Sequence, residues 1–392
     1  MKKLNVGIIG AGTMCRAHSL GYAAMPMHFP DASAVPVRKV LCDINDELAR
    51  QGAERYGWEE SMSDWRELVA RPDIDVIDVV VPNDLHLDIC SEAAKNGKMI
   101  YCEKPLGLSF EDSLEIYHTI EKYGVRNAIA FNKRRWPAVM FAHKLIKAGV
   151  IGDVVAFRGC MQQSFALNPD LPLTWKFRKE KTGGGAIIDI GSHAIDLARY
   201  LVGDIDEVCG VLKTVFPERP LPPKGNNLFW AAKAEGAPMG KVEVDDLASF
   251  MCKFHNGAVG TFEVSRVASG KGDGCGFEVW GTKGAIRWDQ QMLGQIELCR
   301  EDDPADQKGF KIIEIGGAHE CGLWNVAGFG IGLGDNKSIE IRDVIEAFAN
   351  GTEFHADFYD GLKVAQIAAA VQRSSETGSW EKIALVDDIA HV

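Results

Sequence analysis

A carboxylate and an imidazole stand four residues apart in the stretch TGGGAIIDIGSHAIDLARYL, residues 182–201. On an α-helix this spacing puts Asp189 and His193 on one side, opposite an apolar stripe. An imidazole with an ordinary pKa of about 6.5 can take a proton from a hydroxyl, and a neighbouring carboxylate can orient it. An exposed ion pair with the same spacing contributes only about 0.2–0.5 kcal/mol and needs no catalytic role. This stretch alone therefore leaves a surface ion pair and half of an active site as equal alternatives.

Polar clusters also follow two apolar runs earlier in the chain. VVVPNDLH carries Pro82, Asn83 and His86, and YCEKPL carries Glu103 and Lys104. Ligands of open α/β sheets bind outside the carboxyl ends of the strands, which is where both clusters are expected. A lysine there can donate a hydrogen bond to a reacting oxygen, although a single lysine after a strand is usually solvated.

A glycine loop follows the first apolar run, in VGIIGAGTMC. Gly10 and Gly12 precede Thr13 and Met14, which open the next helix, and Cys15 occupies the third glycine position of a dinucleotide-binding loop. Glycines here let backbone N–H groups approach a pyrophosphate at the helix N-terminus. The alternative is a simple tight turn.

The second apolar run ends in Asp43. A carboxylate at this place can accept hydrogen bonds from the adenosine ribose and repel a 2′-phosphate, and no Lys or Arg follows directly. The pattern therefore favours NAD over NADP. Asp43 can instead, or in addition, cap the helix that begins near Asn45.

The elements that would position these residues form an α/β pattern over residues 1–130. Short apolar runs alternate with amphipathic segments, which is typical of βα units and a parallel sheet. We predict a Rossmann dinucleotide-binding domain there. Its strands are expected at 5–10, 38–43, 75–81, 98–103 and 127–131, its helices at 45–57, 84–97 and 110–124, and a Pro- and Ala-rich link at 25–36.

Residues 131–392 show a different pattern, which predicts a second α/β domain with a mostly antiparallel sheet. Strand-like runs follow one another at hairpin spacing, and FHNGAV contains an Asn-Gly turn. Strands are expected at 153–159, 248–254, 258–264, 276–281 and 284–288, helices at 137–148, 338–350 and 359–377, and a long loop at 216–243.

Composition excludes several classes of partner. The formal charge of −12 opposes binding to nucleic acid or an anionic membrane surface. No apolar run approaches the ~18 residues that span a bilayer. The ten cysteines include no C-x-x-C pair, which argues against a metal site and indicates thiols in a reducing cytoplasm.

Taken together, the motifs resemble one known family. GIIGAGTMCRAH, VPNDLH, CEKPL, AFNKRRWPA, KLIKAGVIGDV and GGGAIIDIGSHAIDLARYLVG occur in order over the first 205 residues. In this combination the chain resembles the Gfo/Idh/MocA family of glucose–fructose oxidoreductase and inositol dehydrogenase, from which Cys15 departs because the family usually has Gly or Ala there. Within it, SDWREL and GLWNVAGFGIGLG resemble the pyranoside 3-dehydrogenases.

The resemblance implies an NAD-dependent oxidoreductase that oxidises a pyranoside, levoglucosan- or glucoside-like, at the C3 hydroxyl. It also implies a large open sheet in the second domain and a homo-oligomer, either dimer or tetramer. The matching catalytic trio is Lys104, Asp189 and His193: His193 as acid/base, Lys104 as donor to the reacting oxygen, and Asp189 as holder of the hydroxyl or imidazole. The glycines of residues 183–185 would let the chain pass close to the nicotinamide.

The cofactor contacts expected from these motifs are Gly10, Gly12, Thr13, Met14, Asp43, Pro82, Asn83, His86, Glu103, Lys104 and Asn132. The substrate contacts expected are Lys104, Gln163, Lys176, Asp189 and His193. Trp175 and Trp324 either stack on a sugar face or belong to the core. Arg134 and Arg135 are either ligand contacts or buried ion-pair partners.

Three other functions stay open. They are an inositol dehydrogenase, a glycosidase that uses NAD without consuming it, and a non-catalytic sensor of sugar or NAD. Retention of the whole trio argues against the sensor more than against the glycosidase.

Overall fold

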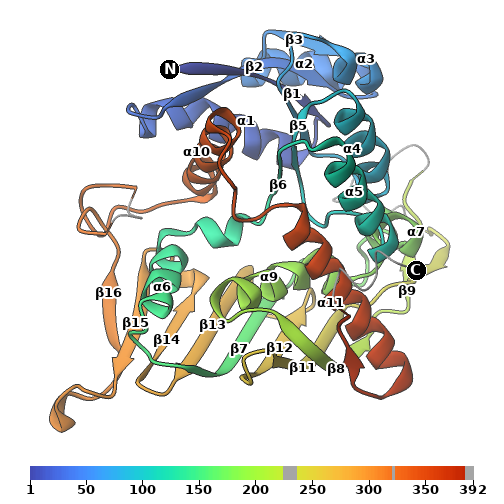
Figure 1. Ribbon diagram of the computed structural model, residues 1–392. Coiled ribbons are helices and arrows are strands. Elements are labelled where there is room, and N and C mark those ends of the chain that lie inside the picture. The colour runs from blue at the N-terminus through green and yellow to red at the C-terminus, as the bar shows by residue number, and fades with distance from the viewer. Residues whose placement is uncertain (224–235, 320–322, 385–392) are drawn as a thin grey trace. The chain divides into compact units, whose positions relative to one another are not determined.

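The computed structural model describes residues 1–223, 236–319 and 323–384 (Figure 1). Within these ranges the chain forms two compact units: Met1–Trp136 with Phe329–Lys363, and Pro137–Gly328 with the residues from Val364 onward. The late segment joins the first unit because helix α10 (Leu333–Asn350) packs along helix α1 (Thr13–His28). Gly21 permits this approach, since a Cβ there would lie 2.7 Å from Ile341 Cδ1.

The first unit is built on a parallel sheet, which confirms the predicted Rossmann domain. Its order in the described residues is β3 (Glu60–Met62), β2 (Ala34–Cys42), β1 (Lys2–Ile9), β4 (Val76–Val79), β5 (Met99–Cys102) and β6 (Asn127–Ile129). The strand order reverses between β1 and β4, where doubly wound sheets bind their ligands.

Helices cover both faces of this sheet (Figure 1). Helices α1 and α10 contact β1 and β2 on one face, and α3 (Trp65–Ala70), α4 (His86–Lys95) and α5 (Phe110–Tyr123) lie on the other. Helix α2 (Asp46–Tyr56) packs against β2 and β3. Because both faces are covered, β4 and most of β5 are buried. The predicted apolar runs correspond to β1, β2, β4, β5 and β6, and β3 was not predicted.

The second unit is built on a larger mixed sheet. Its order within the described residues is β16 (Lys311–Glu314), β15 (Gln295–Arg300), β14 (Gly284–Asp289), β13 (Asp273–Gly281), β7 (Val154–Gln163), β12 (Val259–Ser265), β11 (Leu247–Phe254), β8 (Ile205–Lys213) and β17 (Glu381–Lys382). Strands β7 and β12 pair in parallel, and the other neighbours in this order are antiparallel. The mostly antiparallel sheet is therefore confirmed.

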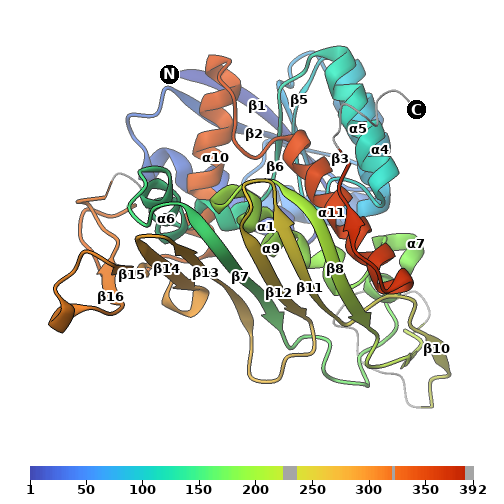
Figure 2. The same ribbon diagram turned by 60° about the horizontal axis from the view of Figure 1, so that its bottom comes forward.

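One face of this sheet is covered by helices and the other is open (Figure 2). Along β11, Ala248, Phe250, Cys252 and Phe254 are buried and alternate with exposed residues, as a half-covered strand requires. The helices on the covered face are α6 (Pro137–Lys147), α8 (Ala186–Asp189), α9 (Gly191–Leu201) and α11 (Phe358–Thr377). Helix α7 (Lys179–Thr182) precedes α8.

Two expected loops contain regular structure. The predicted link at 25–36 is partly helical, because α1 continues through Pro26 to His28, and β2 already begins at Ala34. The predicted loop at 216–243 carries a small antiparallel pair, β9 (Glu218–Pro220) with β10 (Met239–Lys241), and its residues 224–235 lie outside the described ranges. No helix within the described part of the chain is both long and apolar enough to cross a membrane.

Candidate active site

The glycine loop between β1 and α1 has the form of a phosphate cradle. Gly10 has φ +108°, and a Cβ there would lie 2.6 Å from the carbonyl oxygen of Val80, so glycine is required. Gly12 is the N-cap of the sixteen-residue helix α1, and a Cβ on it would meet open space. The first turn of α1 contains no acidic residue. Open space, unopposed N–H groups and the positive end of the helix together fit the pyrophosphate of a dinucleotide.

Cys15 fills the third glycine position without reaching the cradle. Its side chain is completely buried, and burial raises the pKa of the thiol to about 12. The sulfur lies 3.9 Å from the hydroxyl of Ser19 within α1. Cys15 is therefore a packed and unreactive thiol.

Asp43 braces the glycine loop from the end of β2. Its Oδ2 accepts from the N–H of Ala11 at 2.8 Å, and its Oδ1 accepts from the N–H of Asn45 at 2.9 Å. The side-chain cap of α2 is Asn45, which accepts from the N–H of Leu48 at 3.1 Å. Asp43 thus holds the cradle in place while Asn45 caps the helix.

The loops after β4 and β5 are tied together by His86. The imidazole is fully buried, with Nδ1 2.9 Å from the carbonyl oxygen of Pro105 and Nε2 3.1 Å from that of Val81. Burial lowers the pKa of His86, against the opposing effect of the carbonyl oxygens that face both of its nitrogens. His86 therefore braces the loops that carry Pro82, Asn83 and Lys104, and its own contact with a cofactor stays a prediction.

Glu103, expected in the cofactor set, is directed into the protein. It is buried, and its Oε2 accepts from the backbone N–H of Lys104 at 3.1 Å. Lys104 itself is partly exposed and is joined to Pro105 by a cis peptide bond.

The short helix after β6, Asn132–Arg135, is held by ion pairs. Arg134 lies 3.0 Å from Asp360, and Arg135 lies 3.1 Å from Asp343 and donates to the carbonyl oxygen of His355 at 3.0 Å. Of the two alternatives for these arginines, the observed contacts are those of buried ion-pair partners. The carbonyl oxygen of Asn132 accepts from Asn336 at 3.1 Å.

In the second unit, Asp189 and His193 lie on two short consecutive helices instead of one. Helix α8 ends at Asp189 and α9 begins at Gly191, with Ile190 between them. Asp189 is partly exposed and forms a 2.8 Å ion pair with Lys176, while His193 is buried to 7% exposure. Asp196, on the same helix as His193, is fully buried. The single polar stripe expected from a continuous helix is therefore divided at Ile190.

The glycine run before α8 is explained by contacts inside this unit. Gly183 ends α7 with φ +74°. A Cβ on Gly185 would lie 1.8 Å from the carbonyl oxygen of Asp245, an impossible distance. The Asp245 carboxylate accepts from the N–H groups of Gly185 at 2.8 Å and Ile187 at 2.9 Å. The run thus lets Asp245 anchor the start of the helix that ends in Asp189.

Asp245 was not among the residues predicted from the sequence. It stands in VEVDDL, where two adjacent carboxylates precede a strand, and that pattern alone does not reveal the partner sixty residues earlier. Burial raises the pKa of Asp245, against the opposing effect of its two backbone hydrogen bonds.

The ammonium of Lys176, which pairs with Asp189, also lies near two aromatic rings. The Lys176 ammonium lies 5.1 Å from the ring centre of Trp175 and 5.9 Å from that of Phe165. Such a group combines an apolar ring surface with hydrogen-bonding heads, which is suited to a sugar. Phe165 was not predicted from the sequence.

Two other residues expected near a substrate lie elsewhere in the second unit. The Gln163 amide donates to Asp273 at 2.6 Å in an exposed pair. Trp324 lies in the loop before α10, with 40% of its surface exposed. Their expected contacts with a substrate stay predictions.

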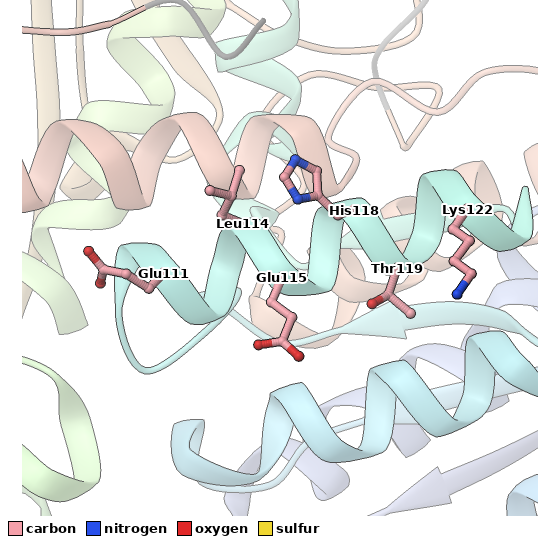
Figure 3. Close-up of a pocket in the computed structure, with 6 residues that line it drawn as sticks. All are labelled: Glu111, Leu114, Glu115, His118, Thr119 and Lys122. Carbon is pink, nitrogen blue, oxygen red and sulfur yellow. The ribbon is translucent and has the colours of Figure 1, made fainter. Parts of the chain in front are cut away.

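In the first unit, a hollow of about 300 Å³ lies along α5 (Figure 3). It is lined by Glu111, Leu114, Glu115, His118, Thr119 and Lys122. These side chains all come from one helix, and none belongs to the predicted site. Among the residues that the structure describes, no group of His, Cys, Asp or Glu could hold a metal ion.

Comparison with known proteins gives matches along nearly the whole chain. Residues 4–131 match the oxidoreductase family with an NAD-binding Rossmann fold, and residues 139–287 match the GFO/IDH/MocA C-terminal domain. Levoglucosan dehydrogenase of Pseudarthrobacter phenanthrenivorans is 44% identical over 382 residues, 97% of this chain and 98% of that protein.

A solved structure of levoglucosan dehydrogenase in complex with NADH and levoglucosan has a TM-score of 0.92 at 42% identity. It covers 98% of this chain and 100% of its own. The NAD-dependent scyllo-inositol 2-dehydrogenase of Bacillus subtilis is 32% identical over 258 residues, 65% of this chain and 67% of that protein.

Proposed function

Because this chain belongs to the Gfo/Idh/MocA oxidoreductase family, whose N-terminal domain is an NAD-binding Rossmann fold, we propose that it is a pyranoside dehydrogenase. The substrate is levoglucosan or a related glucoside, and the C3 hydroxyl is oxidised. The observation that carries this proposal is the similarity to levoglucosan dehydrogenase over 97% of the chain.

NAD is the proposed cofactor, and it supplies the carbon that accepts the hydride. Gly10, Gly12, Thr13 and Met14 surround its pyrophosphate in this proposal, and Asp43 accepts from its ribose hydroxyls. The remaining proposed contacts, toward the nicotinamide half, are Pro82, Asn83, His86, Lys104 and Asn132. Glu103 is left out of this set because its two oxygens are held by His18, Lys337 and the N–H of Lys104.

Each of the three proposed catalytic groups has its own task at the reacting hydroxyl. His193 takes the proton of the sugar hydroxyl, because an imidazole can hold a proton near neutral pH. Lys104 donates a hydrogen bond to the same oxygen and stabilises its developing negative charge. Asp189 holds the hydroxyl in line with His193.

Lys176 and Gln163 complete the proposed substrate contacts. The 2.8 Å ion pair between Lys176 and Asp189 fixes the direction of the carboxylate. The rings of Trp175 and Phe165 beside the same ammonium offer an apolar surface for a sugar face. This group of side chains supports a sugar substrate in preference to a small hydroxy acid.

An inositol dehydrogenase is the second candidate function. The 32% identity to scyllo-inositol 2-dehydrogenase favours it, because a cyclitol and a pyranose present the same ring of secondary hydroxyls.

We also propose that the protein assembles into a homo-oligomer through the open face of its larger sheet. Val211, Met251 and Val259 lie on this face with 50–57% of their surfaces exposed. The cysteines of the described residues carry thiols, which supports a cytoplasmic location.

The proposal is tested with purified protein, NAD and a panel of levoglucosan, glucosides and inositols, following NADH absorbance. We expect steady NADH formation with a pyranoside and a 3-keto sugar as the product. Fastest turnover with an inositol would favour the second candidate. Release of free sugar from a glucoside without net NADH would indicate a hydrolase and contradict the proposal.

A further inference from the structure

A histidine is buried between two carboxylates beneath the Lys104 loop. Nδ1 of His18, on α1, lies 2.8 Å from Oδ2 of Asp78 on β4, and Nε2 lies 2.9 Å from Oε1 of Glu103. All three side chains are at least nine-tenths buried. The imidazole also stacks on the ring of Tyr101, with centres 5.0 Å apart.

Two carboxylates on opposite sides of one imidazole define its protonation state. A carboxylate oxygen can only accept, so both ring nitrogens must donate, and His18 is an imidazolium. Burial opposes this charge, but Asp78 and Glu103 outweigh burial and raise the pKa of His18.

A second buried cation reaches the same carboxylate from α10. Nζ of Lys337 lies 3.3 Å from Oε1 of Glu103, 2.7 Å from Oε2 of Glu340 and 3.1 Å from the hydroxyl of Tyr101. Although burial opposes ionisation, Lys337 and His18 lower the pKa of Glu103 below its ordinary value. Glu103 is therefore a carboxylate held by two cations.

The second carboxylate oxygen of Glu103 binds the next residue in the sequence. Oε2 accepts from the backbone N–H of Lys104 at 3.1 Å, while Oε1 is held by His18 and Lys337. One rigid carboxylate thus joins helices α1 and α10 to the peptide that carries Lys104. Since the carboxylate cannot turn without losing a charge-assisted bond, it restricts the position of that peptide.

We propose that His18, Glu103 and Lys337 are positioning residues for Lys104, acting through its backbone N–H. The inference rests on the proposed function, in which Lys104 donates to the reacting oxygen. It gives Glu103 a role toward the catalytic lysine in place of direct contact with the cofactor. Burying several charges is costly, and apolar packing could join the helices to the sheet at lower cost, which argues for a role beyond stability.

The test is a double-mutant cycle with Glu103→Gln and Lys104→Ala, in which kcat and the dissociation constant of NADH are measured. Glu103→Gln keeps the shape of the side chain and removes its charge. We expect it to lower kcat at least about tenfold in the wild-type background and less than twofold beside Lys104→Ala, because its effect passes through the lysine. NADH binding should change less than threefold.

A second pair of variants separates positioning from folding. Lys337→Met should lower kcat and Lys337→Arg should restore it. The control is Lys98→Met at the opposite end of β5, where a buried ammonium donates to the carbonyl oxygen of Ile74 at 2.9 Å. This change removes a buried charge next to β5, at the end of the strand away from Glu103, and we expect kcat within twofold of wild type.

Equal losses from Glu103→Gln in both backgrounds, or no loss in either, would overturn the inference while leaving the proposed function intact. Wild-type turnover in Lys104→Ala alone would overturn the catalytic role of the lysine and the inference with it.

Discussion

At the scale of single residues, Asp43 holds the glycine loop and is also proposed to bind the cofactor. Its two oxygens accept from the N–H groups of Ala11 and Asn45, so the carboxylate fixes the glycine cradle. Neither bond requires a full negative charge, but an amide has a single acceptor oxygen and would therefore keep only one of the two bonds. We therefore propose that the charge discriminates against a 2′-phosphate.

Asp43→Asn should therefore reveal the role of the charge, since it removes the charge while it keeps the shape and one of the two hydrogen bonds. We expect the ratio of kcat/KM for NADP to that for NAD to rise at least about tenfold, equivalent to about 1.4 kcal/mol of lost repulsion. Steady-state kinetics with both cofactors measures the ratio. Glu47→Gln, an exposed carboxylate on α2, is the control and should leave it unchanged. The same ratio in Asp43→Asn as in wild type would mean that Asp43 serves the loop alone.

The sequence predicted candidate site residues where they belong to a local motif. It did not predict the contacts that their side chains make. The glycine cradle and the polar loops after β4 and β5 follow from local spacing. The position of the His86 ring between two backbone carbonyls, and of His18 between two carboxylates, depends on loops and strands brought together by the fold. No spacing rule encodes either contact.

At the scale of elements, Gly185 controls where α8 begins. Its Cα faces the backbone of Asp245 so closely that no side chain fits, and the Asp245 carboxylate holds the first N–H groups of the helix. Asp189, the last residue of α8, depends on this anchor for its position beside Lys176.

Gly185→Ala should therefore displace α8. We expect a loss of about 3 kcal/mol or more in the free energy of unfolding, because overpacking against backbone cannot be relieved by a rotamer change. Urea unfolding measures the loss, and kcat should fall with it. Gly294→Ala is the control, since a Cβ there meets open space, and its stability should stay within about 0.5 kcal/mol. Wild-type stability in Gly185→Ala would show that the contact with Asp245 is easily relieved.

Periodicity predicted most elements of both units to within a few residues, and it failed where tertiary contacts decide. The strands expected at 75–81 and 258–264 appear as Val76–Val79 and Val259–Ser265. The break at Ile190 was not predicted, because the apolar stripe continues across it. The return of α10 to the first unit was not predictable either, since it depends on packing against Gly21.

At the scale of the whole molecule, the open face of the larger sheet exposes apolar side chains. Phe250 and Phe262 stack on the covered side, with ring centres 4.2 Å apart, while Met251 and Val259 face outward from the same strands. Exposed apolar side chains at the centre of a broad sheet are typical of an interface. The resemblance implied an open sheet, and the alternation of buried and exposed residues along β11 and β12 shows which side chains face outward.

Met251→Glu should weaken self-association, because it places a charge in the middle of this face. We expect light scattering after size exclusion to show a shift toward the monomer of 42.9 kDa. Met239→Glu is the control, since this methionine is equally exposed but lies on β10 outside the large sheet. An unchanged mass in Met251→Glu, or a monomeric wild-type protein, would contradict the proposed assembly.

The central claim is that Lys104 and His193 carry out the oxidation of a sugar hydroxyl by NAD. The most direct measurement compares kcat of Lys104→Ala and His193→Ala with wild type, on the best substrate of the panel, with NADH binding measured by fluorescence. We expect each variant to lose roughly 10²- to 10⁴-fold in kcat, a much larger change than its change in NADH binding. Turnover close to wild type in either variant would contradict the account.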